Sequence, residues 1–316
     1  MDMTRRERVE AAVHGNPVDR VPVCFWHHFR PKGSPQRLAY ATERFFGGFD
    51  LDIFKIMPDI PYPFPRNSIR EVGDWDLVAP LDSSTGNMGR FVETVPILRD
   101  RIGDDTPIVV TVFSPMCLAV QFAGIEVIRK HMHEDPAQLH YALSTIAHNL
   151  GDLSRDVIDA GAAGIFLAAW GGADQLLTRE QYREFAAPYD LEVLQQCRAG
   201  WLNILHVHGD GHLLIDDFLQ YPVDVLNWSD RLTGLTLREV RQKKPDLCLM
   251  GGCHERGPMV HGTAGDMEAE IVDALEQTDG GHRFILANGC SIPDDTDDRL
   301  LHQWTDVARK RVQRRA

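Results

Sequence analysis

Two histidines one residue apart are the first residues in this chain whose types and spacing favour chemistry. The segment His206-Val207-His208-Gly209 ends a short apolar run, and side chains two positions apart on an extended segment lie on the same side. Both imidazoles can then reach one metal ion at about 2 Å from each nitrogen. A lone His-x-His pair among 14 histidines is usually incidental. The hypothesis of a metal site therefore depends on what lies beside the pair.

Three later apolar runs end in further residues of metal-ligand type. These ends are Asn227-Trp228-Ser229-Asp230, Gly251-Gly252-Cys253-His254-Glu255 and Asn288-Gly289-Cys290-Ser291. A cysteine at a strand end is often only a small buried apolar residue, but four consecutive ends of this kind favour a shared metal site. The predicted ligands are His206, His208, Cys290 and Asp230, and the further candidates for a ligand or catalytic role are Cys253 and His254.

The elements that must position these residues form an alternating series. Short apolar runs, typical of buried parallel strands, alternate with helical segments. The predicted strands lie near Val21–Phe25, Leu51–Ile56, Ile108–Phe113, Gly164–Ala168, Ile204–Val207, Asp224–Trp228, Leu247–Met250 and Phe284–Ala287. Eight strands alternating with helices predict an α/β fold, a (β/α)₈ barrel of the TIM type, as a single domain over residues 1–316. Such barrels carry their sites on the loops that follow the strands.

The predicted helices occupy most of the intervals between these strands. A helical extension precedes the barrel, because Thr4 to Glu7 matches a capping box and Gly15 with Pro17 ends the helix near His14. The other predicted helices are Pro35–Phe46, Ile125–His131, Pro136–Ala160, Arg179–Arg198, His212–Gln220, Leu235–Lys243, Asp266–Thr278 and Asp297–Arg311. The proline-rich stretch from Pro58 to Arg90 lacks a clear period, so we predict a long excursion at the C-terminal face of the barrel.

Other side chains near the predicted strand ends are candidates for a substrate pocket. For each of them an ordinary packing role explains the residue equally well. The candidates are Trp26, His27, His28, Asp59, Tyr62, Trp170 and Trp228. Because the loops after the first three strands set specificity, the sequence leaves the identity of the substrate open.

The composition limits the classes of protein to which the chain can belong. With 43% hydrophobic and 25% charged residues, its 316 residues can bury a core of ordinary size. The formal net charge of -13 argues against a nucleic-acid partner. The charged start from Met1 to Glu10 lacks the apolar region of a signal peptide, and no apolar run approaches the roughly 20 residues of a membrane helix. We therefore expect a cytoplasmic protein with no membrane partner, in which six scattered cysteines form no disulfide framework.

The chain resembles members of the uroporphyrinogen decarboxylase superfamily over essentially its whole length. The matching parts are Met3 to Pro22, Phe49-Asp50 with Lys55, Met57, Pro58 and Asp59, Leu177 to Tyr182 with Pro188-Tyr189-Asp190, Gly262-Thr263, and Ile285 to Thr296. This resemblance also implies a barrel fold, and by analogy with the superfamily we expect a homodimer.

Within that superfamily, the zinc-dependent cobamide methyltransferases carry a His-x-Cys pair after one strand and a cysteine in a Gly-Cys element after the last. His206 and Cys290 match two of these ligands, and His208 replaces the third. The spacing is also similar to the zinc site of cobalamin-independent methionine synthase, where a carboxylate follows at about the interval that separates His208 from Asp230. The resemblance thus implies a Zn²⁺-dependent methyltransferase acting on a small molecule, with a corrinoid carried by a partner protein as co-substrate. Replacing a thiolate by an imidazole makes the metal a stronger Lewis acid, which favours an oxygen ligand over the thiol of the parent family.

Decarboxylation is the alternative function. Resemblance to the true uroporphyrinogen decarboxylases would imply a metal-free cleft. That cleft has an Arg-rich element near the N-terminus and an Asp that faces the pyrrole nitrogens. Phe25 to Arg30 stands in that place here, with one Arg in place of the expected pair. A substrate with several carboxylates needs several cations. Decarboxylation of a porphyrinogen-like or smaller carboxylic acid therefore ranks second. A scaffold that only binds a metal or a corrinoid ranks third.

Overall fold

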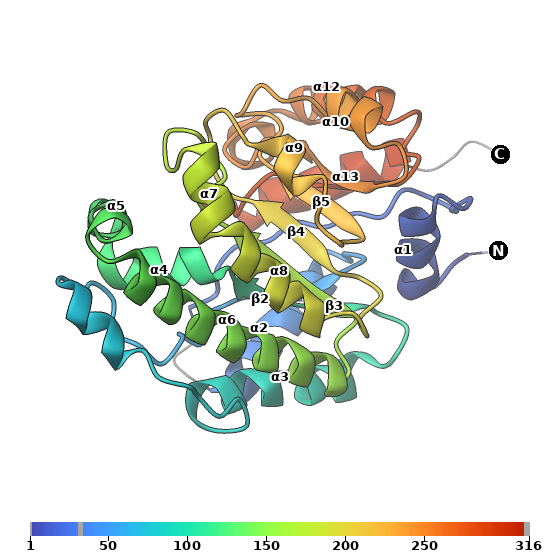
Figure 1. Ribbon diagram of the computed structural model, residues 1–316. Helices are drawn as coiled ribbons and strands as arrows, with labels where there is room; N and C mark the ends of the chain where they lie inside the picture. The colour runs from blue at the N-terminus through green and yellow to red at the C-terminus, as the bar shows by residue number, and fades with distance from the viewer. Residues whose placement is uncertain (1, 31–33, 313–316) are drawn as a thin grey trace.

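The computed structural model describes residues 2–30 and 34–312. Seven parallel strands form one curled sheet in chain order from β1 to β7, and helices pack around it (Figure 1). The strands are β1 (Phe54–Ile56), β2 (Ile108–Phe113), β3 (Gly164–Ala169), β4 (Ile204–Val207), β5 (Val225–Trp228), β6 (Cys248–Cys253) and β7 (Phe284–Asn288). Every one is buried, as the apolar runs of the sequence predict. The alternation of strands and helices is confirmed, with seven strands in place of eight among the described residues.

The segment predicted as the first strand lies between β7 and β1 without forming a regular strand. Val23 makes a single parallel bridge to Leu286 of β7. On the other side, the backbone N–H of Asp52 donates to the carbonyl of Val23, and the N–H of Val23 donates to the Asp52 carboxylate at 2.7 Å. A side chain thus replaces the next bond of the ladder, and Pro22 has no N–H to contribute. These two features explain why the sequence pattern of a strand gives only a bridge.

The α-helices follow the predicted order with four differences. They are α1 (Arg5–His14), α2 (Pro35–Gly48), α3 (Gly86–Ile102), α4 (Pro115–Ala123), α5 (Ile125–Glu134), α6 (Pro136–Asp159), α7 (Arg179–Phe185), α8 (Ala187–Gln196), α9 (Ile215–Phe218), α10 (Leu237–Lys243), α11 (Pro258–His261), α12 (Ala264–Gln277) and α13 (Asp298–Val312). The predicted helix Arg179–Arg198 is divided at Ala186, because Pro188 lacks the N–H that would continue α7. Helices α3 and α4 and the four-residue α11 were not predicted.

Helices α3 and α4 have unusual sequences. Helix α3 begins at Gly86, within the predicted excursion, and carries Pro96 in its interior. Helix α4 is apolar on most of its surface, so no amphipathic period marks it, and Ser114 caps its first turn by accepting from the N–H of Cys117. The excursion that remains, from residue 57 to residue 85, contains one short 3₁₀-helix, η1 (Val72–Leu77).

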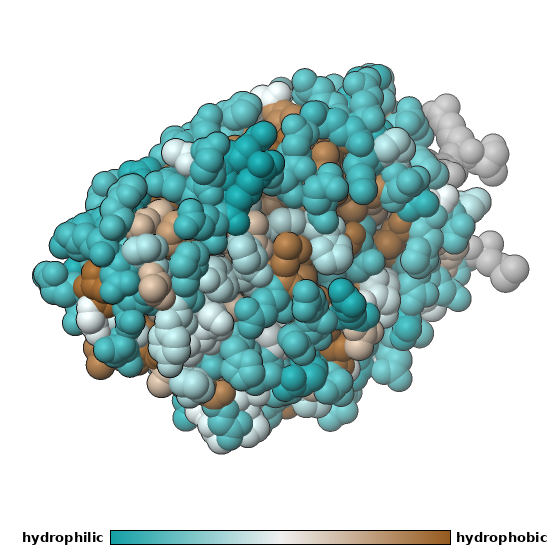
Figure 2. Space-filling view, in the orientation of Figure 1, coloured by the Kyte–Doolittle hydropathy of each residue, from teal (hydrophilic) through white to brown (hydrophobic). Residues whose placement is uncertain are grey.

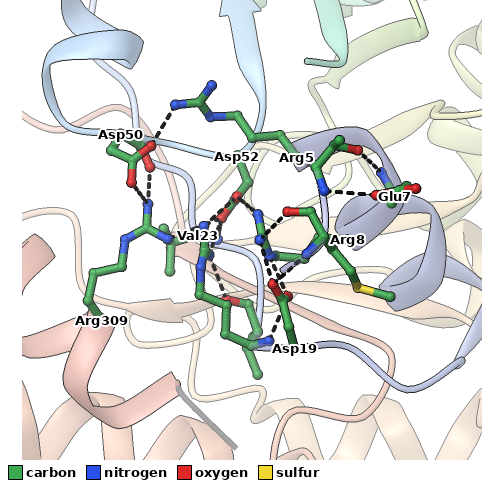
Figure 3. Close-up of polar contacts among 12 residues, drawn as sticks. Arg5, Glu7, Arg8, Asp19, Val23, Asp50, Asp52 and Arg309 are labelled. Carbon is green, nitrogen blue, oxygen red and sulfur yellow. Dashed lines mark hydrogen bonds and ion pairs between the residues drawn. The ribbon is translucent and has the colours of Figure 1, made fainter. Parts of the chain in front are cut away.

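A network of ion pairs attaches α1 to the sheet (Figure 3). The fully buried carboxylate of Asp52, just before β1, lies 2.8 Å from Nη1 of Arg8 and 2.6 Å from Nη1 of Arg20. Arg309 of α13 lies 3.0 Å from the carboxylate of the neighbouring Asp50. The first and last helices are therefore joined to the start of β1 through adjacent acidic residues.

The outer surface is mostly polar. On the face shown in Figure 2, hydrophilic residues predominate and hydrophobic residues occur in small separate groups. Within the described residues, no helix combines the length and the apolar character that crossing a membrane requires.

Candidate metal centre

Three of the predicted ligands come together at the C-terminal ends of the strands. One ligand atom each of His206, His208 and Cys290 lies within 4.8 Å of the others. The Cys290 sulfur is 3.7 Å from Nδ1 of His208. Ligands of a tetrahedral Zn²⁺ at about 2.0 to 2.3 Å from the ion lie roughly 3.5 Å apart. Small side-chain rotations would therefore let all three bind one ion.

The neighbouring strands fix the orientation of His206. Its Nδ1 lies 2.6 Å from Oδ1 of Asn227, the residue paired with it on β5. The Asn227 amide group donates to the carbonyls of Met250 and Asn288, at 2.9 and 3.1 Å. Because the amide nitrogen donates both bonds, Oδ1 must accept, and the proton of His206 lies on Nδ1. The Nε2 lone pair is thus left free for a metal, as in metal sites whose histidines are held by a second hydrogen bond.

Burial sets the protonation of the three side chains. Burial, with His208 and Lys55 nearby, lowers the pKa of His206 to about 3, and burial also lowers the pKa of His208. Burial raises the pKa of Cys290 to about 11, and the charge of Glu255 acts in the same direction. The donor set consists of two neutral imidazoles and one thiol, and a bound cation would deprotonate the thiol. Such a set suits Zn²⁺.

The other predicted ligands do not join this group. Asp230 accepts a hydrogen bond from the N–H of Gly252 at 3.0 Å, and its second oxygen lies 3.4 Å from Nε of Arg231. Burial raises the pKa of Asp230 to about 6. Its carboxylate therefore links the loop after β5 to the end of β6.

Cys253 and His254 also lie apart from the three converging ligands. Cys253 is fully buried in the core, and His254 accepts a hydrogen bond from the N–H of Arg256 at 3.0 Å. Spacing along the chain cannot show which of several consecutive polar residues turns toward the site.

The three converging residues border a cavity of about 980 Å³. The inward faces of β1 to β4 form its floor, and the excursion after β1 contributes Pro58, Pro61 and Arg66 to its wall. Four of the predicted pocket residues line it, namely Trp26, His28, Asp59 and Trp170.

Three predicted pocket residues lie outside this cavity. Tyr62 lines a smaller neighbouring pocket, where its hydroxyl accepts from Asn149 at 2.8 Å. His27 packs edge-on against Phe45. Trp228 is fully buried, and its indole N–H donates to the carbonyl of Leu235. For His27 and Trp228 the ordinary packing role therefore holds.

The cavity wall carries more positive charge than the sequence analysis assigned to it. Arg30, Arg66 and Arg256 are exposed at the cavity, and Lys55 lines it from β1. The sequence comparison counted only Arg30, because the other cations come from distant parts of the chain. The N-terminal element still contributes one arginine, and the folded cavity adds Arg66 and Arg256 from elsewhere in the chain.

The loop after residue 26 is held over the cavity by Asp59. This carboxylate lies 2.7 Å from Nδ1 of His28 and accepts from the N–H groups of Phe29 and Arg30. Burial alone would raise the pKa of Asp59, but these hydrogen bonds bring it below its usual range. The bonds place the side chain of Arg30 at the cavity mouth.

Comparison with known proteins places this architecture in a family. The family model for uroporphyrinogen decarboxylase (URO-D) matches residues 53–311. The chain belongs to the URO-D family.

The relatives of this URO-D family member include proteins with two activities. A uroporphyrinogen decarboxylase of Synechococcus sp. is 26% identical, over 84% of this chain and 75% of that protein. The methylcobamide:CoM methyltransferase MtaA of Methanosarcina barkeri is 23% identical, over 92% of this chain and 93% of that protein. A solved methyltransferase from Methanosarcina mazei has a TM-score of 0.79 at 18% identity, covering 98% of this chain and 99% of that one. The structural likeness shows a shared fold, and the family contains both decarboxylases and methyltransferases.

Lys55 is a residue of this URO-D cavity that the sequence analysis did not assign to the site. Its Nζ lies 4.2 Å from the ring centroid of Phe166 and 5.0 Å from that of Trp26. Burial lowers the pKa of Lys55 to about 7. A lysine within a predicted buried strand is costly to fold, and this was a signal that could have marked it.

Glu255 is a second residue that was passed over in favour of its neighbours. It is buried, and Oε1 accepts from the hydroxyl of Ser229 at 2.6 Å. Its Oε2 has no hydrogen-bond partner among the described residues. That atom lies 3.1 Å from where a side chain on Gly289 would begin, beside Cys290. Glu255 is therefore a buried carboxylate next to the candidate metal ligands.

Proposed function

We propose that this URO-D family protein is a zinc-dependent methyltransferase in which His206, His208 and Cys290 hold the metal. The observation that carries the proposal is the convergence of the three side chains in one cavity, with His206 oriented by Asn227. Two imidazoles and one thiolate leave a fourth position for the substrate, as in catalytic rather than structural zinc sites.

The charge of this ligand set bears on the acceptor. One thiolate against Zn²⁺ leaves a single net positive charge, because Asp230 lies apart from the three ligands. When bound, the ion would lower the pKa of a thiol or hydroxyl acceptor and hold it as an anion. The chain itself supplies a cavity wall with three arginines, one of which, Arg30, is paired with Asp294, and this charge favours acceptors that carry negative charge.

The donor is proposed to be a methylated corrinoid carried by a partner protein. The relative MtaA is a methylcobamide:CoM methyltransferase, and the similarity to it covers 92% of this chain. The cavity of about 980 Å³ opens at the strand ends, where a large co-substrate can approach.

Metal analysis and a transfer assay test the proposal. Purified protein should contain about one zinc per chain. His206→Ala and Cys290→Ser should lose the metal and keep the far-ultraviolet circular dichroism of the parent, because a core of this size does not depend on a metal. Methylcobalamin should be demethylated in the presence of a thiol or alkoxide acceptor, followed by its visible spectrum. Full activity in a protein free of zinc would contradict the proposal.

Decarboxylation of a carboxylic acid remains the second candidate, and the cavity cations favour it. Arg66 and Arg256 can bind carboxylates of a substrate, and Asp59 lies in the same cavity. Release of carbon dioxide from a polycarboxylic acid by chelator-treated protein would support this function over methyl transfer.

A further inference from the structure

Lys55 has a chemical environment that neither methyl transfer nor the metal explains. The residue is 1% exposed, and its ammonium group donates to the thioether of Met57 at 3.2 Å. Within the described part of the chain, no carboxylate lies within ion-pair distance of it. A buried ammonium without an anion is strongly disfavoured, so the neutral amine gains population. The pKa of about 7, lowered by burial, agrees with this reading.

The amine of Lys55 is at the wall of the reaction cavity. Lys55, Trp26 and Phe166 all line the cavity of about 980 Å³. The ring of His206 stacks on Phe166 with the centroids 5.4 Å apart, so Lys55 and this candidate metal ligand contact the same aromatic ring. A lysine desolvated by apolar walls is a nucleophile toward carbonyl carbon.

A hydrogen-bonding group faces the same space from the next strand. Lys55 pairs with Val109 of β2, and Thr111 lies two residues further on, so the side chains of Lys55 and Thr111 point to the same side of the sheet. Thr111 lines the cavity, is 4% exposed, and has a hydroxyl without a hydrogen-bond partner among the described residues. A valine would fill the same space in this strand, so the unpaired hydroxyl points to a partner on a ligand.

We propose that Lys55 captures the carbonyl group of a small keto acid as an imine, with the Thr111 hydroxyl hydrogen-bonded to the carbonyl oxygen. The amine nitrogen forms a bond to the carbonyl carbon, and the carbonyl oxygen leaves as water with the two amine hydrogens. The carboxylate of the keto acid binds Arg66 or Arg256, which are exposed at the same cavity. This activity goes beyond methyl transfer and needs no metal.

Reductive trapping tests the proposal with pyruvate as the probe. The protein is incubated with pyruvate and sodium borohydride, and the adduct is located by intact mass and peptide mapping. We expect one reduced adduct per chain on Lys55, and none on that peptide in Lys55→Arg or Lys55→Met. Lys130→Arg, a change at a lysine on the surface helix α5, is the matched control and should trap normally. Thr111→Val should slow trapping about tenfold, the effect of one lost hydrogen bond.

The design separates this inference from the metal proposal. Trapping is measured in zinc-loaded and chelator-treated protein, while zinc content is measured on its own. Lys55→Met removes the amine and keeps most of the side-chain length, and circular dichroism confirms that the variant is folded. Absence of an adduct with both pyruvate and glyoxylate, or adducts spread over surface lysines and unchanged in Lys55→Met, would overturn the proposal.

Discussion

His206 and Asn227 share a hydrogen bond of 2.6 Å between Nδ1 and Oδ1, and two backbone carbonyls hold the Asn227 amide in the orientation that this bond requires. The bond fixes which nitrogen of His206 is free. We predict that Asn227→Ala weakens zinc binding by about 10- to 100-fold, as is usual for partners of metal-binding histidines. Competition with a chromophoric chelator measures the affinity.

Asn149→Ala is the control for this change. Asn149 is also buried, and it binds Tyr62 and the backbone of residues 79 and 81. Its loss should lower the free energy of unfolding and leave zinc affinity unchanged. Equal zinc affinities for Asn227→Ala and the parent would show that His206 needs no orienting partner.

Exchange of His208 for cysteine should change the electronic character of the site. His208→Cys gives a ligand set of one imidazole and two thiolates, which neutralises Zn²⁺ and binds it more tightly. In cobalt-substituted protein, the sulfur-to-cobalt charge-transfer absorption should roughly double, because it scales with the number of thiolate ligands. Unchanged absorption would mean that position 208 does not contact the metal.

Gly289 should tolerate no side chain. A Cβ at this position would lie 2.5 Å from the Cα of Ser229. Because this contact is with backbone, the two chain segments cannot move apart at low cost. Gly289→Ala should lower the free energy of unfolding by about 1–3 kcal/mol and displace the adjacent Cys290. The matched control is Gly48→Ala, because a Cβ at Gly48 meets no atom within 4 Å. Urea unfolding and zinc content are the measurements, and equal behaviour of the two variants would refute the steric argument.

A buried acid should make stability depend on pH. Asp190 of α8 accepts hydrogen bonds from Tyr182 at 3.0 Å and Tyr221 at 3.1 Å, yet burial raises its pKa to about 7 from an ordinary 3.8. The folded state therefore holds this proton more tightly than the unfolded state. The stabilisation is complete below about pH 4 and is lost as the pH rises to about 7.

Asp190→Asn removes this dependence on pH. The free energy of unfolding of the variant, relative to that of the parent, should increase as the pH rises from 5 to 8, because the amide never ionises. Urea unfolding at both pH values gives the comparison, in which all other titrating groups cancel. A constant difference between the two proteins would mean that Asp190 is ionised in the folded state throughout.

The strand ends that carry the site could be predicted because buried parallel strands appear as short apolar runs. His206, His208 and Cys290 follow such runs, and parallel strands end at one edge of a sheet. The sequence could not distinguish the side chains within one strand end. Asp230 bonds to Gly252 and Cys253 is fully buried, and both orientations depend on contacts with distant residues.

The remaining errors also have physical causes. The first predicted strand is reduced to a bridge because the Asp52 side chain takes a backbone bond, an event that no local pattern encodes. Helix α3 escaped prediction because it begins with Gly86 and contains Pro96, both poor helix formers. The cations of the cavity wall are separated by long stretches of chain, so only the folded structure brings them together.

The ion pairs around Asp52 should contribute strongly to stability. Asp52 is fully buried between Arg8 and Arg20, and removal of one partner leaves buried charge uncompensated. Asp52→Ala should lower the free energy of unfolding by about 3–5 kcal/mol, measured by urea unfolding. Glu10→Ala, which removes an exposed pair with Arg6 on the surface of α1, should change it by less than about 1 kcal/mol. Similar losses for both would contradict a special role of burial.

The ion pairs of Asp50 and Asp52 also affect folding during translation. Arg8 and Arg309 both reach the short segment before β1, so α1 and α13 share an anchor although they are made far apart in time. Until α13 leaves the ribosome, Asp50 lacks the guanidinium group of Arg309, and α13 cannot pack in its place in the fold. Completion of the fold therefore has to wait until residue 309 has left the ribosome, and a nascent chain stalled before residue 309 should remain sensitive to protease.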